Sequence, residues 1–315
     1  MGTTLFEMGL GPGDPPELWN INFSNQVLKV HNEFIDAGSD IILTNSFGAN
    51  GLRLKLHNME LETHKINLAS AKISREAVKK IGTKILICGS MGPTGELIEP
   101  LGPLTMSRAV EVFGEQAFAL KEGGVDAIWI ETISSKEELL AAINGALPTG
   151  LPIIITMSFD TAGKTMMGFS PVDLTNLKKS LGSQIIAFGA NCGVGPATLV
   201  SNICDLGHAA GKKDILVAKG NCGIPEFKEG KVCYSGSTKM MASYASLCRN
   251  AGASIIGGCC GTTAAHIKAI AVYLKKETVK PPPTIKDIEM LLGSIDRPKR
   301  ANQKKLQHRR QKRRF

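Results

Sequence analysis

Seven short apolar runs recur along the chain, and they constrain its fold more than any other feature. Each run is rich in Ile and Val and is continuous rather than alternating with polar residues. Continuous runs of this length are typical of strands that are buried on both faces, as in a parallel sheet. The sequence therefore predicts seven strands, at residues 40–44, 84–88, 126–130, 151–156, 184–188, 214–218 and 253–257.

Stretches with helical periodicity separate these runs. Several of them end at a glycine shortly before the next strand, as at Gly38, Gly82 and Gly123, and glycine is a common residue at a helix C-terminus. The segment Ser134–Glu137 is typical of a cap that opens a helix. We expect helices over residues 24–37, 60–81, 106–122, from 134 onward, and over 173–181, 197–210, 237–250 and 263–276.

Alternating strands and helices are compatible with an open doubly wound sheet or with a (β/α)8 barrel. Polar or reactive residues follow nearly every predicted strand, among them Asn45, Glu131, Ser158, Asn191 and Cys259. A ring of such strand ends favours the barrel, because an open sheet concentrates its site at one switch point. We therefore expect an α/β fold of the (β/α)8 TIM barrel type. Residues 2–6 could supply only the tail of its first strand, so we expect that strand to be short or truncated.

Basic residues are concentrated at the end of the chain. Residues 297–315 contain ten Lys or Arg and no Asp or Glu, whereas the rest of the chain holds 27 basic and 28 acidic residues. Such a block is usually disordered, although it can also attract nucleic acid. We expect a barrel domain over residues 1–276, a Pro-rich linker with a short surface helix over 277–296, and a basic disordered tail over 297–315.

The sequence lacks the signals of membrane insertion and secretion. No run approaches the ~18 apolar residues that a membrane span requires, and the first residues do not resemble a signal peptide. We therefore expect a cytoplasmic protein without membrane contact. Its eight cysteines are then expected to be thiols or metal ligands rather than disulfides.

Two adjacent cysteines, Cys259 and Cys260, follow the last predicted strand and have glycines on both sides. Two thiolates in such a turn can bind one tetrahedral zinc ion, which needs at least one further ligand. Cys192 and Cys222 each follow an Asn at the end of another strand, and their positions do not decide between them. Three thiolates with one open position form a catalytic rather than a structural zinc site.

Three motifs together resemble the homocysteine S-methyltransferase family over residues 1–276. They are the runs Ile130–Thr132, Gly189–Cys192 and Gly257–Thr263. Three further runs are similar to bacterial betaine–homocysteine methyltransferase-like proteins and to the homocysteine module of methionine synthase, namely Thr44–Gly48, Gly89–Gly95 and Lys219–Pro225. The resemblance implies a (β/α)8 barrel and a zinc ion bound by Cys192, Cys259 and Cys260.

The resemblance also implies a site for homocysteine. It assigns Glu131 to the amino group of homocysteine and places Ser158 and Asn191 in the same site. A free thiol is mostly protonated at neutral pH, because its pKa is about 8.5, and binding to zinc deprotonates it. The zinc-bound thiolate is expected to attack a methyl group on a positively charged nitrogen or sulfur. No protein general base is then required.

Three classes of methyl donor stay open: an onium acid such as glycine betaine, S-methylmethionine, and a methylated corrinoid protein. Aromatic faces bind quaternary ammonium groups, so we expect a betaine-type donor near Asn45, Phe47 and Phe159. The expected partners are thus homocysteine and this donor. An alternative of another class is a non-catalytic barrel whose basic tail binds nucleic acid.

Overall fold

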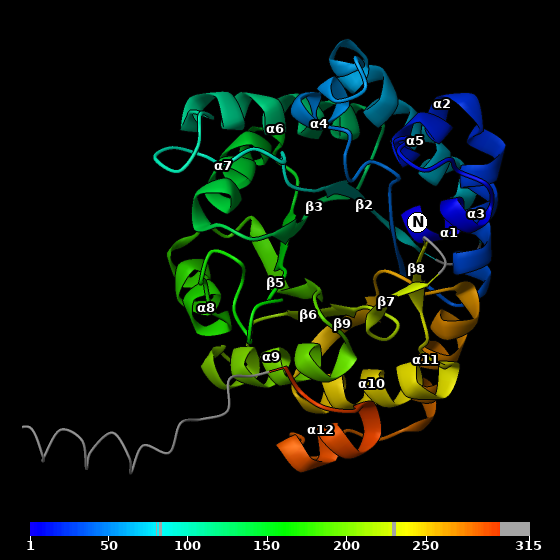
Figure 1. The fold of residues 1–315 in the computed structure, drawn as a ribbon, viewed down its shortest axis with the longest axis vertical. Coiled ribbons are helices and arrows are strands. Elements are labelled where there is room, and N and C mark those ends of the chain that lie inside the picture. The colour runs from blue at the N-terminus through cyan, green and yellow to red at the C-terminus, as the bar shows by residue number, and fades with distance from the viewer. Residues whose placement is uncertain (80, 82–83, 229–230, 297–315) are drawn as a thin grey trace, which may run out of the picture.

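The computed structural model of the protein describes residues 1–79, 81, 84–228 and 231–296. Its centre is a curled parallel sheet of seven strands surrounded by helices (Figure 1). Every predicted apolar run forms one of these strands. In spatial order they are β1 (Ile41–Leu43), β2 (Leu86–Met91), β3 (Ala127–Ile133), β4 (Ile153–Met157), β5 (Ile185–Cys192), β6 (Leu216–Gly220) and β9 (Ala253–Gly258).

Both faces of the sheet are buried, which explains why the strands do not alternate in polarity. On β3, Ile128 and Ile130 are fully buried and belong to the main core. Trp129, between them, belongs to a smaller cluster with Cys88 of β2 and Val217 of β6. Burial on both sides of one strand requires apolar residues at successive positions.

The helices follow the strands in the expected order, and polar caps fix several of their starts. The Thr105 hydroxyl accepts a hydrogen bond from the Arg108 backbone N–H (3.2 Å), and Ser135 caps its helix in the same way. The helices are α1 (Gly2–Glu7), α2 (Trp19–Asn22), α3 (Ser24–Asp36), α4 (Gly51–Lys55), α5 (Thr63–Val78), α6 (Met106–Glu122), α7 (Lys136–Ala146), α8 (Pro171–Ser180), α9 (Pro196–Ala209), α10 (Thr238–Asn250), α11 (Ala264–Lys276) and α12 (Ile285–Leu292). Short 3-10 turns cover Pro16–Leu18, Glu60–Glu62 and Leu147–Thr149.

The start of the chain differs from the prediction. Residues 2–6, expected to supply the tail of a first strand, lie in helix α1, and no strand precedes β1 in the described part of the chain. Leu5 of α1 is fully buried in a small cluster with Leu10 and Val30. The segment thus buries Leu5 beside Val30 of α3 instead of pairing with the sheet, while Phe6 is 48% exposed. The prediction of a strand tail at residues 2–6 is wrong.

The sheet consequently has two edges, β1 and β9, and we call the gap between them the seam. Helices α3 and α11 pack against each other behind it, so the outer layer closes where the sheet does not. A cavity of about 960 Å³ runs from the carboxyl ends of the strands along the seam. Apolar side chains line its seam portion, including Phe34, Ile41, Leu43, Ile255, Ile267 and Leu274.

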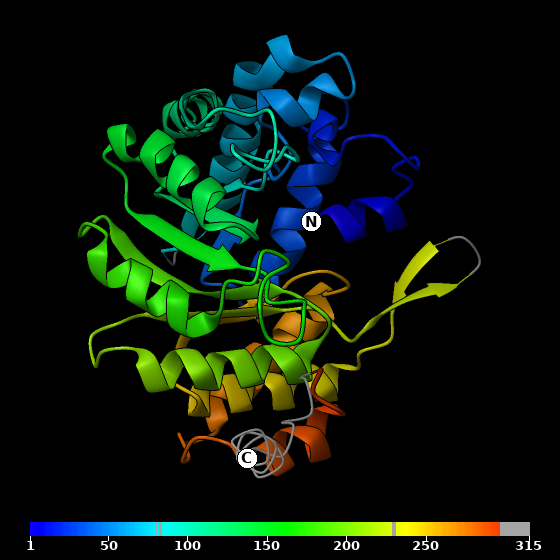
Figure 2. The same ribbon diagram turned by 60° about the vertical axis from the view of Figure 1, so that its left-hand side comes forward.

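A hairpin that the sequence analysis missed projects from the body (Figure 2). It consists of β7 (Pro225–Lys228) and β8 (Lys231–Tyr234), which pair with each other in antiparallel orientation. In the sequence the hairpin lies between β6 and α10. Phe227 is 76% exposed and Val232 is 58% exposed. The hairpin therefore buries no apolar face that would have revealed it in the sequence.

Helix α12 forms where a short surface helix was expected, and it packs against α9 and α10 through Ile288. The predicted disordered tail at 297–315 lies outside the described residues. Within the described residues, no helix has both the length and the apolar character needed to cross a membrane.

Candidate functional site

Three thiols from two strands meet at the carboxyl end of the sheet. Cys192 ends β5, and Cys259 and Cys260 directly follow β9. Their sulfur atoms all lie within 4.8 Å of one another, and Cys192 Sγ is 3.9 Å from Cys260 Sγ. A tetrahedral zinc ion with Zn–S bonds of about 2.3 Å holds its sulfur ligands about 3.8 Å apart. The spacing of the thiols fits such an ion.

The backbone around this three-thiol cluster is tightly constrained. Cys192 has a φ of 60°, a left-handed conformation that is uncommon outside glycine and often found at functional sites. Gly261, after the cysteine pair, has a φ of 73°. A Cβ atom at Gly261 would lie 2.3 Å from the Cβ of Tyr234. Glycine here allows Tyr234 to pack directly against the turn that presents the thiols.

The three thiols differ in acidity. Hydrogen bonds from the Cys192 and Cys260 thiols, together with the nearby charge of Lys219, lower the pKa of Cys259 well below its ordinary value. Hydrogen bonds of Cys192 with Cys259 and Cys260 raise the pKa of Cys192. The Lys219 charge favours the thiolate of Cys259, which is the form that binds metals.

The structure separates the two candidates for the third cysteine position. Cys192 belongs to the cluster, whereas Cys222 is fully buried outside it. The Cys222 thiol lies 3.3 Å from the carbonyl oxygen of Gly236 and 3.4 Å from His266 Nε2. Cys222 supports the turn through its backbone, because its N–H donates to the carbonyl oxygen of Cys260 (2.9 Å).

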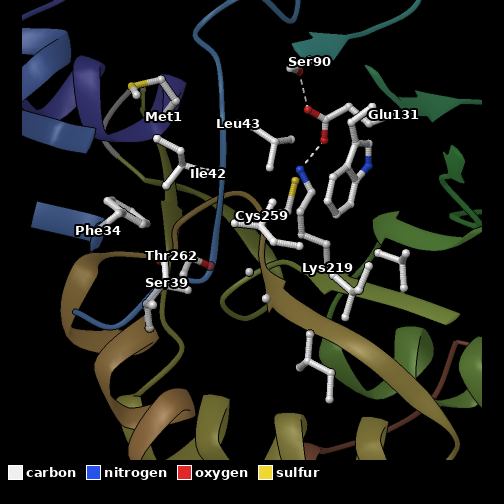
Figure 3. Close-up of a pocket in the computed structure, with 18 of the residues that line it drawn as sticks. Met1, Phe34, Ser39, Ile42, Leu43, Ser90, Glu131, Lys219, Cys259 and Thr262 are labelled. Carbon is white, nitrogen blue, oxygen red and sulfur yellow. Dashed lines mark hydrogen bonds and ion pairs between the residues drawn. The ribbon is translucent and has the colours of Figure 1, made fainter. Parts of the chain in front are cut away.

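Glu131, at the carboxyl end of β3, is 5% exposed and lies beside the cluster in the cavity. The Ser90 hydroxyl donates to Glu131 Oε1 (2.6 Å), and Lys219 Nζ forms an ion pair with Oε2. Figure 3 shows Lys219 reaching from β6 toward Glu131, with Cys259 beside it. Desolvation lowers the pKa of Lys219, but the charges of Glu131 and Cys259 outweigh it and the pKa is raised. Lys219 is thus a buried cation.

The other two residues expected to bind homocysteine lie outside the lining of the cavity. Asn191 is 1% exposed, and both ends of its amide bind Thr132: Oδ1 accepts from the backbone N–H (2.9 Å), and Nδ2 donates to Oγ1 (2.7 Å). Ser158 is also buried and donates to Asp160 Oδ2 (3.3 Å). In this structure Asn191 ties β5 to β3 next to the cluster.

The residues expected at the donor are divided between the cavity and the core. Phe47 is half-buried and lines the cavity. Asn45 also lines it, but its amide donates to the carbonyl oxygen of Pro16 (2.8 Å). Phe159 is 2% exposed and packs in the main core. Among the three, Phe47 is therefore the aromatic face that the cavity offers.

Lys219 and Ser90 are site residues that the sequence analysis did not select. Lys219 ends an apolar run within a strand, and a Lys in that position is seldom buried unless it is paired. The position of Lys219 at the end of an apolar run could therefore have indicated a buried lysine with a charged partner. Its partner Glu131 lies 88 residues away in sequence, so only the fold reveals the pair.

Fold and site together define a class: an α/β protein with a three-thiol cluster, spaced so that it could hold a metal ion, at the carboxyl end of a curled parallel sheet. The sequence profile of the family described as homocysteine S-methyltransferase matches residues 1–274. The chain belongs to the homocysteine S-methyltransferase family.

Solved structures of the homocysteine methyltransferase MmuM from Escherichia coli have the same fold. The oxidized form matches with a TM-score of 0.71 and 22% identity, covering 86% of this chain and 93% of that chain. The metallated form matches with a TM-score of 0.70 and 21% identity over the same shares. The family match and this fold support a methyltransferase that acts on homocysteine.

Proposed function

We propose that the protein transfers a methyl group from an onium donor, with glycine betaine the preferred one, to homocysteine, giving methionine. The observation that carries the proposal is the three-thiol cluster of Cys192, Cys259 and Cys260 beside the Glu131 carboxylate in one cavity. The spacing of the sulfurs suits zinc, and the E. coli relative has been crystallised in a metallated form. Reduced thiols also suit a cytoplasmic location.

In this proposal each residue has a distinct part. Zinc, when bound by the three cysteines, would supply the acidity that turns the homocysteine thiol into a nucleophile at neutral pH. Glu131 accepts the ammonium group of homocysteine, and Ser90 holds that carboxylate in place by its hydrogen bond to Oε1 (2.6 Å).

The donor is expected on the side of the cavity where Phe47 lies. A cation over an aromatic face gains roughly 0.5–2 kcal/mol, and Phe47 is fixed by close packing against Gly92, where a Cβ atom would lie 2.5 Å from the ring. Trp19 and Phe23 form a tilted pair with their ring centroids 5.0 Å apart, but neither ring lines the cavity. The aromatic face of Phe47 is therefore the feature that supports an onium donor.

A donor panel tests the proposal. The purified, zinc-loaded protein is incubated with homocysteine and with glycine betaine, dimethylsulfoniopropionate, S-methylmethionine or a methylated corrinoid protein, and methionine is measured. We expect methionine from glycine betaine or a related onium acid without any corrinoid. Methionine formed only with S-methylmethionine or only with the corrinoid protein would overturn the donor assignment. No methionine with any donor would overturn the function itself.

A further inference from the structure

The ammonium group of Lys219 has fewer partners than a buried cation needs. Its side chain is 13% exposed, and it lines the cavity. An ammonium group has three N–H donors, yet Glu131 Oε2 is the one acceptor found for it among the described residues. The indole ring of Trp129 lies 5.6 Å from Nζ and covers a further side. The remaining donors therefore face the cavity and call for an anionic ligand group.

We propose that Lys219 binds the α-carboxylate of homocysteine, in a site that rests on the function proposed above. Homocysteine is a zwitterion, with its ammonium and carboxylate on one carbon and its thiol two methylene groups away. Glu131 and Lys219 present the opposite charges side by side, next to Cys259 (Figure 3). The substrate inserts between them, with its ammonium on Glu131 and its carboxylate on Lys219.

Charge balance supports this assignment. The ion pair of Glu131 and Lys219 is neutral as a unit, and a zwitterion that inserts into it leaves both buried charges paired. A thiol that carries an amine but no carboxylate would place its ammonium group close to Lys219 with no compensating anion. Unpaired buried charges are costly. Lys219 is thus a specificity-determining residue that selects α-amino acid thiols.

A second lysine shows what a structural ion pair looks like in this protein. Lys178 pairs with Asp214 (2.8 Å), and its Nζ lies 5.9 Å from the ring centroid of Phe188. It has the same two kinds of partner as Lys219, but it does not line the cavity. Lys178 is therefore a matched control.

The test compares two thiols by calorimetric binding to the zinc-loaded protein: homocysteine and 3-aminopropane-1-thiol, which lacks the carboxylate. We expect the unaltered protein to bind homocysteine about 10- to 100-fold more tightly, the range of a charge-assisted hydrogen bond. Lys219→Met is expected to bind both thiols equally. Lys219→Arg, which keeps the charge, and Lys178→Met are expected to keep the preference for homocysteine.

The Lys219→Met variant leaves Glu131 without its cation and can lose stability. The comparison is therefore repeated in a Glu131→Gln background, where Glu131→Gln alone keeps the preference for homocysteine and the double variant loses it. A preference that survives in both Lys219→Met proteins would overturn the proposal and direct attention to the α-amino group of Met1, which also lines the cavity. Failure of the unaltered protein to bind either thiol would instead overturn the proposed function.

Discussion

The cluster end of the cavity and the seam differ in how their residues are held. At the cluster, Glu131 and Lys219 come from β3 and β6, strands that are paired on both sides. At the seam, β1 and β9 each have a neighbour on one side, and apolar side chains face the gap. Hydrogen bonds fix the polar groups at the cluster end, whereas the packing of apolar side chains defines the seam.

Strand β9 belongs to both regions, because it is a sheet edge and it also leads into Cys259 and Cys260. Although β9 is an edge strand, hydrogen bonds to β6 and to Asn221 hold the turn that carries the two cysteines. The Cys259 N–H donates to the carbonyl oxygen of Gly220 (2.7 Å), and the Cys260 N–H donates to Asn221 Oδ1 (3.0 Å). Cys259 and Cys260 are thus held from the β6 side, while the next residue, Gly261, donates to Thr3 Oγ1 of α1 (3.3 Å).

The largest effect is expected at the cluster. Cys260→Ala should lower metal affinity and methionine formation by more than about 100-fold, which exceeds the upper range for outer-shell changes at metal sites. The melting temperature should change little, because Cys260 lies outside the main core. Metal analysis, a methionine assay and a thermal melt check this. The control is Cys233→Ala, an exposed thiol on the hairpin; equal metal loss in both variants would contradict the assignment.

The seam should be revealed by amide hydrogen exchange. Amides of β1 and β9 are expected to exchange about 100-fold faster than those of β4, because edge strands carry unpaired backbone groups and open locally at lower free energy. All five residues of β4 are buried between paired neighbours. Equal protection of all three strands, measured by mass spectrometry or NMR, would show that the seam is as closed as the rest of the sheet.

Glu131→Ala tests the polar network at the cluster end. The KM for homocysteine should rise about 10- to 100-fold, since a charge-assisted hydrogen bond to the substrate ammonium is lost. The KM for the donor should stay nearly unchanged. Steady-state kinetics with each substrate varied in turn separate the two values. An equal rise in both would indicate general damage to the cavity.

The seam side also contains a buried histidine that should make stability depend on pH. Burial, with a smaller effect from the charged chain N-terminus, lowers the pKa of His31 from 6.5 to about 3. Between these values the unfolded state binds a proton that the folded state does not, so stability is full above pH 6.5 and falls as pH decreases toward 3. The unfolding equilibrium should shift about tenfold per pH unit.

Denaturant unfolding at several pH values measures this dependence. His31→Gln is expected to flatten the slope between pH 6 and pH 4, whatever its effect on stability at neutral pH. His64→Gln is the control, because the His64 side chain is 54% exposed. An unchanged slope in His31→Gln would assign the acid sensitivity to other groups.

The smallest effect is expected at the donor side. Phe47→Ala should raise the apparent KM of the onium donor about 2- to 30-fold, which corresponds to the roughly 0.5–2 kcal/mol of a cation–aromatic contact. Binding of homocysteine should be nearly unaffected. Phe159→Ala is a useful contrast, because Phe159 lies in the core and its loss should lower the melting temperature instead. An unchanged donor KM in Phe47→Ala would remove Phe47 from the donor site.

Sequence reasoning predicted the elements whose signal is local. All seven strands of the main sheet and the bounds of α6 (Met106–Glu122) follow from continuous apolar runs and glycine stops. Helix α1 was missed because its burial depends on contacts of Leu5 with Val30, far along the chain. The hairpin was missed because Phe227 and Val232 are exposed, so no buried face marks it.

The site was predictable where neighbouring residues carry it and not where the fold assembles it. The Cys259–Cys260 pair with its glycines is visible in the sequence, and the resemblance pointed to Cys192. The ion pair of Lys219 with Glu131 joins β6 to β3 and leaves no local pattern. Phe159 was expected at the donor, but a strand-end position does not reveal whether a ring faces the cavity or the core.

The proposed function requires zinc, held by Cys192, Cys259 and Cys260, for methyl transfer to homocysteine. The most direct measurement removes metal with a chelator, returns zinc in steps, and records methionine formation at each step. We expect activity to be lost with the metal and to return in proportion to zinc, reaching its maximum at about one zinc per chain. Full methyl transfer by the metal-free protein would contradict this requirement for zinc.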